Sequence, residues 1–147
     1  MIFTYILIFL FVIILTIIIL YFLSVYVFPR KIEEIQKMIE AGQIKLAIRK
    51  LNEILEKDER NPYAHFLLAE AYAADGNTQY AIVEYRQVLK MGRFDDKIKE
   101  VYVRQVLAKL YKEKKAFEDA KKEFLILTKI DPANYENFFE LGMIYYN

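Results

Sequence analysis

The sequence predicts an all-α protein in which an N-terminal transmembrane helix is followed by an α-solenoid, an array of stacked helical hairpins. Three observations lead to this fold class. Residues 1–28 contain no charged side chain, small and bulky residues recur 34 positions apart in the rest, and glycines separate the two halves of the repeated unit. We expect a transmembrane helix over residues 1–29 and a repeat domain over residues 30–147.

The N-terminal run is long enough to cross a membrane. At about 1.5 Å per residue, residues 1–28 span roughly 40 Å, more than the hydrocarbon core of about 30 Å. A cleavable signal peptide is the competing interpretation, but it requires a basic residue before the apolar run and a cleavage site of small residues. Neither feature is present. We therefore favour an uncleaved helix that contacts the lipid bilayer through residues 1–28.

The charges that follow the apolar run predict its orientation. No basic residue precedes the run, and six follow it closely: Arg30, Lys31, Lys37, Lys45, Arg49 and Lys50. Because basic flanks stay on the cytoplasmic side, we expect a single-pass protein of the bacterial inner (cytoplasmic) membrane with its repeats in the cytoplasm. Pro29 either forms a kink or short hinge or opens the next helix in its first turn.

A repeated unit fills the rest of the chain. Gly42 and Gly76 are 34 positions apart, as are Ala47 and Ala81. A third copy lies 39 residues beyond the second, which places a five-residue insertion within residues 91–100. This spacing predicts about 3.5 hairpins, with repeats at about 28–61, 62–95 and 101–134 and a half repeat at 135–147.

Helix packing explains why small residues recur. Two antiparallel helices cross closely only where the side chains between them are small, and Ala69 and Ala81 supply that contact in the second unit. Gly76 can adopt the positive φ that ends one helix and starts a tight turn. The third unit has Lys115 at that place, so its turn must form without glycine.

This pattern resembles the tetratricopeptide repeat family, over about 118 residues. The family's signature positions fall in the second repeat on His65, Leu68, Ala69, Tyr72, Ala81, Tyr85, Val88 and Arg93. In the third they fall on Arg104, Leu107, Ala108, Tyr111, Ala120, Phe124, Leu127 and Pro132. The first repeat departs from the signature in its first helix.

The resemblance implies a concave groove lined by the first helices of successive repeats. The groove positions are Tyr63, Phe66, Glu70, Tyr102, Gln105, Lys109 and Phe139. Aromatic and charged side chains in such a groove suit an extended peptide or a partner helix, although some could simply pack against one another. Some relatives grip a terminal carboxylate with cationic side chains, but the corresponding positions here contain no cation. They are Ile32, Gln36, Leu67, Tyr102 and Val106.

Composition argues against several other functions. A net charge of +1 gives no support for nucleic-acid binding, and the absence of cysteine excludes disulfides and thiolate metal sites. His65 is the single histidine and occupies a bulky signature position, where we expect a packed or hydrogen-bonded side chain. No nucleophile motif, phosphate loop or metal-ligand cluster appears. We therefore expect no enzyme, no catalytic residue, no cofactor and no metal site.

Three functional interpretations remain. The first is a membrane-anchored scaffold that binds a protein or peptide partner. The second is part of an envelope assembly or regulatory machinery, since the layout is similar to bacterial lipopolysaccharide-assembly proteins; those also carry a cysteine-rich metal module, and this chain has no cysteine. The third is an enzyme or an enzyme subunit, for which His65 is the candidate residue. A fragment of a longer repeat protein is a separate alternative. Because the half repeat at 135–147 has no second helix, self-association through this uncapped end is a further expectation.

Overall fold

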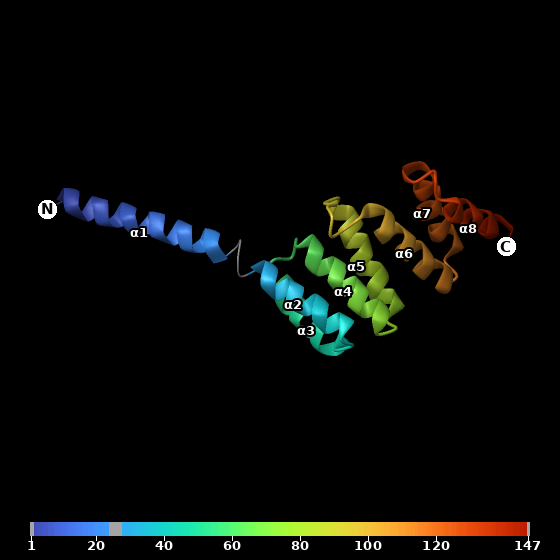
Figure 1. Ribbon diagram of the computed structural model, residues 1–147, viewed down its shortest axis with the longest axis horizontal. Coiled ribbons are helices and arrows are strands. Elements are labelled where there is room, and N and C mark those ends of the chain that lie inside the picture. The colour runs from blue at the N-terminus through green and yellow to red at the C-terminus, as the bar shows by residue number, and fades with distance from the viewer. Residues whose placement is uncertain (1, 24–27, 147) are drawn as a thin grey trace.

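The fold is entirely helical over the residues that the computed structural model describes, which are 2–23 and 28–146 (Figure 1). These residues form eight helices and no strand. The helices are α1 (Ile2–Phe22), α2 (Phe28–Glu40), α3 (Ile44–Leu55), α4 (Pro62–Ala74), α5 (Thr78–Met91), α6 (Glu100–Glu113), α7 (Phe117–Ile130) and α8 (Tyr135–Tyr146). Asn61 starts α4 by accepting a hydrogen bond from the N–H of Ala64 at 3.0 Å, and Pro62 is the first helical residue.

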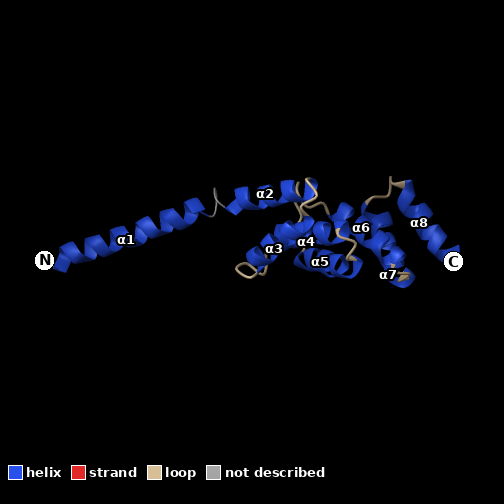
Figure 2. Cartoon of the chain, turned by 90° about the horizontal axis from the view of Figure 1, so that it is seen from below, coloured by secondary structure: helices blue, strands red, loops and turns tan. Residues whose placement is uncertain are grey.

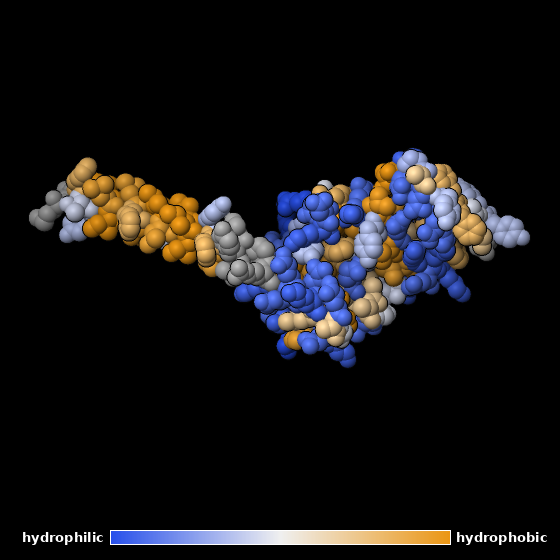
Figure 3. Space-filling model, viewed as in Figure 1, coloured by the Kyte–Doolittle hydropathy of each residue, from blue (hydrophilic) through white to orange (hydrophobic). Residues whose placement is uncertain are grey.

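Helix α1 projects away from the other helices and exposes apolar side chains over its whole length (Figure 3). Its segment Phe3–Phe22 is long and apolar enough to cross a membrane, a test that a signal sequence also passes, and it buries no side chain. The expected hinge falls partly on residues 24–27, which lie outside the described residues. Pro29 lies in the first turn of α2, one of the two places expected for it.

The remaining helices form three hairpins and one further helix, which agrees with the predicted solenoid of about 3.5 units. Consecutive helices from α2 to α8 pack on one another, and α2 also contacts α4. Figure 2 shows α2, α6 and α8 along one edge of the array and α5 and α7 along the opposite edge. The first helices α2 and α4 line a common cleft, and α4 and α6 meet through aromatic rings, so these three helices share one surface.

The helix crossings confirm the predicted role of the small residues. Five alanines at the crossings have no exposed surface: Ala47, Ala69, Ala81, Ala108 and Ala120. The large signature side chains Leu51, Tyr85 and Phe124 fill the space beside them and are at most 2% exposed. The repeat register thus places a buried alanine on the second helix of each hairpin, and a second one on the first helix in repeats two and three.

The five-residue insertion forms an ordered loop between α5 and α6. The Oδ1 atom of Asp95 accepts hydrogen bonds from the N–H groups of Lys97 at 2.8 Å and Ile98 at 2.9 Å. Ile98 is 2% exposed and belongs to the core formed with α4, α5 and α6. The Asp95 turn and the buried Ile98 therefore hold the loop in place, and together they fix the backbone position of Lys97.

The turns between paired helices are alike even where glycine is missing. Gly76 has φ +75°, and its N–H bonds the carbonyl of Ala73 at 3.1 Å. Lys115 has φ +58°, and its N–H bonds the carbonyl of Lys112 at 2.9 Å. In both turns the next residue donates at 2.8 Å to the carbonyl five positions earlier. A Cβ built on Gly76 meets nothing within 4 Å, so the positive φ alone favours glycine there.

Replacing Lys115 by glycine should stabilise the protein. A non-glycine residue in the left-handed region is strained by about 1–2 kcal/mol, partly offset by the greater freedom of glycine in the unfolded chain. We expect Lys115→Gly to raise the free energy of unfolding by about 1 kcal/mol in urea denaturation of the full chain in mild detergent. The control is Lys114→Gly, where φ is −80° and glycine should destabilise. Equal effects of the two changes would contradict this explanation.

Candidate partner-binding groove

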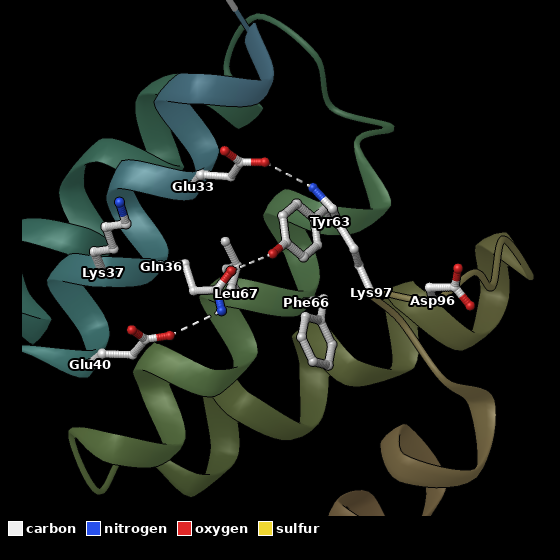
Figure 4. Close-up of a pocket in the computed structure, with 9 residues that line it drawn as sticks. All are labelled: Glu33, Gln36, Lys37, Glu40, Tyr63, Phe66, Leu67, Asp96 and Lys97. Carbon is white, nitrogen blue, oxygen red and sulfur yellow. Dashed lines mark hydrogen bonds and ion pairs between the residues drawn. The ribbon is translucent and has the colours of Figure 1, made fainter.

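A cleft of about 510 Å³ opens between α2, α4 and the loop that precedes α6 (Figure 4). Its lining residues are Glu33, Gln36, Lys37, Glu40, Tyr63, Phe66, Leu67, Asp96 and Lys97. The first four come from α2, the next three from α4 and the last two from the insertion loop. The cleft thus joins the first helices of repeats one and two to the insertion in front of repeat three.

A row of aromatic rings extends from this cleft toward α6. The rings of Tyr63 and Phe66 are stacked, with centroids 6.3 Å apart and planes at 9°. The ring of Phe66 meets that of Tyr102 edge-on, with centroids 6.0 Å apart. The hydroxyl of Tyr63 donates to Oε1 of Gln36 at 2.7 Å, which fixes the first ring against α2. These offset and edge-on arrangements are the favoured geometries of aromatic pairs, so the row is a defined surface.

Glu70 lies beside this row and accepts hydrogen bonds from two tyrosine hydroxyls. The hydroxyl of Tyr102 donates to its Oε1 at 3.1 Å, and the hydroxyl of Tyr85 donates to the same oxygen. Burial, and then the adjacent carboxylate, raise the pKa of Tyr102 to about 12. The same causes raise the pKa of Tyr85 further. Both hydroxyls are therefore neutral donors near neutral pH, and they orient the carboxylate without cancelling its charge.

Lys97 closes one end of the cleft. Its Nζ atom lies 3.2 Å from Oε1 of Glu33 and 5.2 Å from the centroid of the Tyr63 ring. Figure 4 shows Lys97 and Glu33 pointing toward each other beside that ring, with Lys37 at the opposite edge. The ion pair is about half exposed on both sides, so its contribution to stability is small. It nevertheless places an ammonium group over an aromatic face.

The structure brings together four of the seven groove residues expected from the sequence. Tyr63, Phe66, Glu70 and Tyr102 form one contiguous cluster, in which they also contact each other as the alternative interpretation anticipated. The other three lie further along the array: Gln105 and Lys109 on α6 and Phe139, 64% exposed, on α8. Lys109 bridges to α8 through Glu136 at 3.9 Å.

Sequence reasoning did not identify Glu33 and Lys97 as groove residues. They are 64 positions apart, and no periodicity connects them. The sequence locates the insertion, but it does not predict where the side chain of Lys97 points. The Asp-x-Lys-Ile order of residues 95–98 was the available signal, because an aspartate commonly accepts hydrogen bonds from backbone N–H groups two and three residues later.

His65 is a packed histidine, as the sequence predicted. It is 9% exposed, its Nδ1 lies 2.5 Å from Oε2 of Glu84, and its Nε2 lies 2.9 Å from the carbonyl of Glu59. In the third repeat the equivalent Arg104 reaches Glu123 at 2.7 Å. Both pairs are 19 residues apart and join the two helices of one hairpin. The same link between paired helices thus occurs in two hairpins, which favours a structural role for His65.

The described residues offer little for metal or cofactor chemistry. No group of three or more histidine, aspartate or glutamate side chains in this part of the chain is arranged to hold a metal ion. The groove instead presents aromatic rings, hydroxyls and charges, which are groups that can contact a bound side chain.

Comparison with known proteins agrees with this architecture. Residues 38–102 match the family model described as tetratricopeptide repeat. The matched region runs from the end of α2 to the start of α6. No match was found among curated proteins.

Several solved structures share the fold of the tetratricopeptide array. The first tetratricopeptide domain of Spaghetti (RPAP3), bound to the HSP90 peptide SRMEEVD, has a TM-score of 0.65 and 20% identity, and the match covers 79% of this chain and 88% of that one. MamA from Desulfovibrio magneticus RS-1 has a TM-score of 0.66 and 19% identity, and the match covers 80% of this chain and 63% of that one. The type III secretion translocator chaperone SycD from Yersinia enterocolitica has a TM-score of 0.65 and 15% identity, and the match covers 80% of this chain and 83% of that one. At these identities the likeness shows the fold alone.

The His65–Glu84 pair should make stability depend on pH. The hydrogen bond from Glu84, more than offsetting the effect of burial, raises the pKa of His65. A raised folded-state pKa means that the pair's contribution is complete below the unfolded value of about 6.5 and is lost as pH rises through the folded value. We expect Glu84→Gln to cost about 1–2 kcal/mol near pH 6 and progressively less toward about pH 9, measured by urea unfolding.

Glu123→Gln is the matched control for this prediction, because its partner Arg104 stays charged throughout that range. Its cost should not change with pH between these limits. A cost of Glu84→Gln that stays constant or grows with pH would contradict the proposed protonation of His65.

Proposed function

We propose that this protein is a membrane-anchored scaffold that holds a peptide or a partner helix in the groove formed by α2, α4 and α6. The observation that carries the proposal is the row of Tyr63, Phe66 and Tyr102 beside the cleft of about 510 Å³. Aromatic side chains dominate the binding energy of most protein interfaces, since they bury large areas at a small cost in side-chain entropy. Tyr63, Phe66, Glu70 and Tyr102 form the centre of this proposed surface, and we propose that it continues along the array to Gln105, Lys109 and Phe139.

The groove is suited to binding because its polar groups are already oriented. The hydroxyls of Tyr63 and Tyr102 are held by Gln36 and Glu70, so little ordering is required when a ligand arrives. The solved structures of similar fold support a binding role: the Spaghetti domain is bound to a peptide and SycD is a translocator chaperone. A tetratricopeptide scaffold is accordingly the function that this geometry favours over catalysis.

The proposed anchor is α1. Every described side chain from Phe3 to Leu23 is exposed, and an uncovered apolar helix of this length needs a lipid or other apolar environment. The basic residues that begin at Arg30 support an arrangement with the repeats on the cytoplasmic side, in a bacterial inner membrane. In this arrangement the groove lies close to the membrane surface, where a bound partner would be retained.

Removing two rings of the groove should abolish partner capture. We expect the Phe66→Ala, Tyr102→Ala double variant to lose at least about tenfold in recovery of bound partner from a detergent extract of the native cell, because two central anchors are removed. Leu125→Ala is the control, since Leu125 is a 38% exposed apolar side chain on α7, outside the groove. Circular dichroism must show that both variants remain folded. Equal recovery with folded wild type and double variant would reject the groove.

The membrane anchor can be tested by extraction with alkaline carbonate. The full chain should stay in the membrane fraction at its full length, whereas a cleaved signal sequence would give a shorter, extractable product. The double variant Ile14→Lys, Leu15→Lys should release much of the chain from the membrane fraction, because each charge at the centre of a transmembrane helix opposes insertion by about 2.5–3.5 kcal/mol. Val83→Lys, at a 42% exposed site on α5, should change nothing. Extraction of the intact wild-type chain would refute the anchor.

A further inference from the structure

We propose that the ligand of the groove carries a cationic side chain, arginine or lysine, which docks against Phe66 and Tyr102 beside the carboxylate of Glu70. The inference rests on the proposed scaffold function and specifies the chemistry of its partner. It is argued from the chain's own cation in the groove, from an equivalent place that has none, and from the charge balance around both.

The first observation is the site that Lys97 already occupies. Its ammonium group lies 5.2 Å from the centroid of the Tyr63 ring and 3.2 Å from the carboxylate of Glu33. An aromatic face attracts a cation through its quadrupole, and the carboxylate adds a charge-assisted hydrogen bond. A ring combined with an acidic group is therefore a cation site in this groove, and the insertion loop supplies the cation at one end.

The second observation is the same combination further along the aromatic row. The rings of Phe66 and Tyr102 meet edge-on, and the carboxylate of Glu70 lies 3.1 Å from the Tyr102 hydroxyl. Among the described residues, no lysine or arginine lies over either of these rings or forms an ion pair with Glu70. The second ring-and-carboxylate site is thus built like the first but holds no cation of its own.

The carboxylate of Glu70 is held by hydroxyl groups and by no cation of the described residues. The hydroxyls of Tyr85 and Tyr102, both neutral, donate to the carboxylate and hold it in place. The side chain is only partly exposed, so solvent and salt screen its charge less than they screen a surface glutamate. A ligand that covered this place with apolar atoms alone would desolvate the charge without compensation, which is costly. A cationic group compensates it.

The wider charge balance favours the same type of ligand. Four carboxylates lie in or beside the cleft, belonging to Glu33, Glu40, Glu70 and Asp96. Lys37 and Lys97 are the cations among the residues that line the cleft, and Lys97 is already paired with Glu33. Further along the groove, Lys109 is paired with Glu136. Complementary charge speeds encounter and repels partners of the same sign. An acidic peptide is therefore disfavoured in this groove, and a basic segment with apolar neighbours is favoured.

The experiment is selection from a displayed random heptapeptide library on the full chain in detergent micelles. Peptides that depend on the groove, identified by their loss on the Phe66→Ala, Tyr102→Ala variant, should be enriched in arginine or lysine. Synthetic copies of a selected peptide should bind about tenfold more weakly to Glu70→Gln in fluorescence anisotropy, as expected for loss of one compensating charge. Glutamine keeps an oxygen that accepts from both tyrosines, so the variant preserves the local hydrogen bonds.

Glu53→Gln is the matched control, because Glu53 is an exposed glutamate on α3, outside this cleft; it should leave binding unchanged. Groove-dependent peptides without enrichment in basic residues would overturn this inference and leave the scaffold proposal standing. Equal affinity for wild type and Glu70→Gln would have the same consequence. If selection gave no groove-dependent peptide at all, the scaffold proposal itself would fall, and this inference with it.

Discussion

The close crossing of paired helices at alanine is the constraint on which the rest of the solenoid depends. Ala69 on α4 and Ala81 on α5 have no exposed surface, so a larger side chain at either place would force the two helices apart. Fixing this contact fixes the rotation of α4 about its axis. Positions three and four residues apart then share another face of the helix, and Tyr63, Phe66 and Glu70 fall on it. The groove surface is thus a geometric consequence of the crossing.

The register that fixes the packing leaves the chemistry of individual positions free to vary. One pair of positions, 19 residues apart, holds His65 with Glu84 in repeat two and Arg104 with Glu123 in repeat three. The corresponding positions in repeat one are Lys31 and Lys50, which cannot form an ion pair with each other. The first hairpin still forms, so the ion pair is an addition to a fold that apolar packing already specifies.

The features of the fold that the sequence predicted are those that depend on local spacing. The hairpins, the buried alanines and the packed His65 all follow from a pattern that recurs within one repeat. The position of Lys97 does not, because it depends on the path of an inserted loop and on a contact with Glu33, 64 residues earlier. Likewise, the sequence shows that Lys115 replaces the glycine of its turn, but only the structure shows that Lys115 adopts a positive φ like that of Gly76. Contacts between residues far apart in the sequence could not be predicted from the repeat period.

The groove and the joint between repeats two and three use the same side chains. No Cα atom of α4 lies within 8 Å of one in α6, although both helices are described in full. The contact between them is instead made by Phe66 with Tyr102 and by Tyr102 with Glu70, and Glu70 also accepts from Tyr85 on α5. One carboxylate therefore connects three helices at the groove floor. A ligand on this surface would add contacts at a joint where the first helices share no direct backbone packing, so binding and the stability of the array are thermodynamically linked.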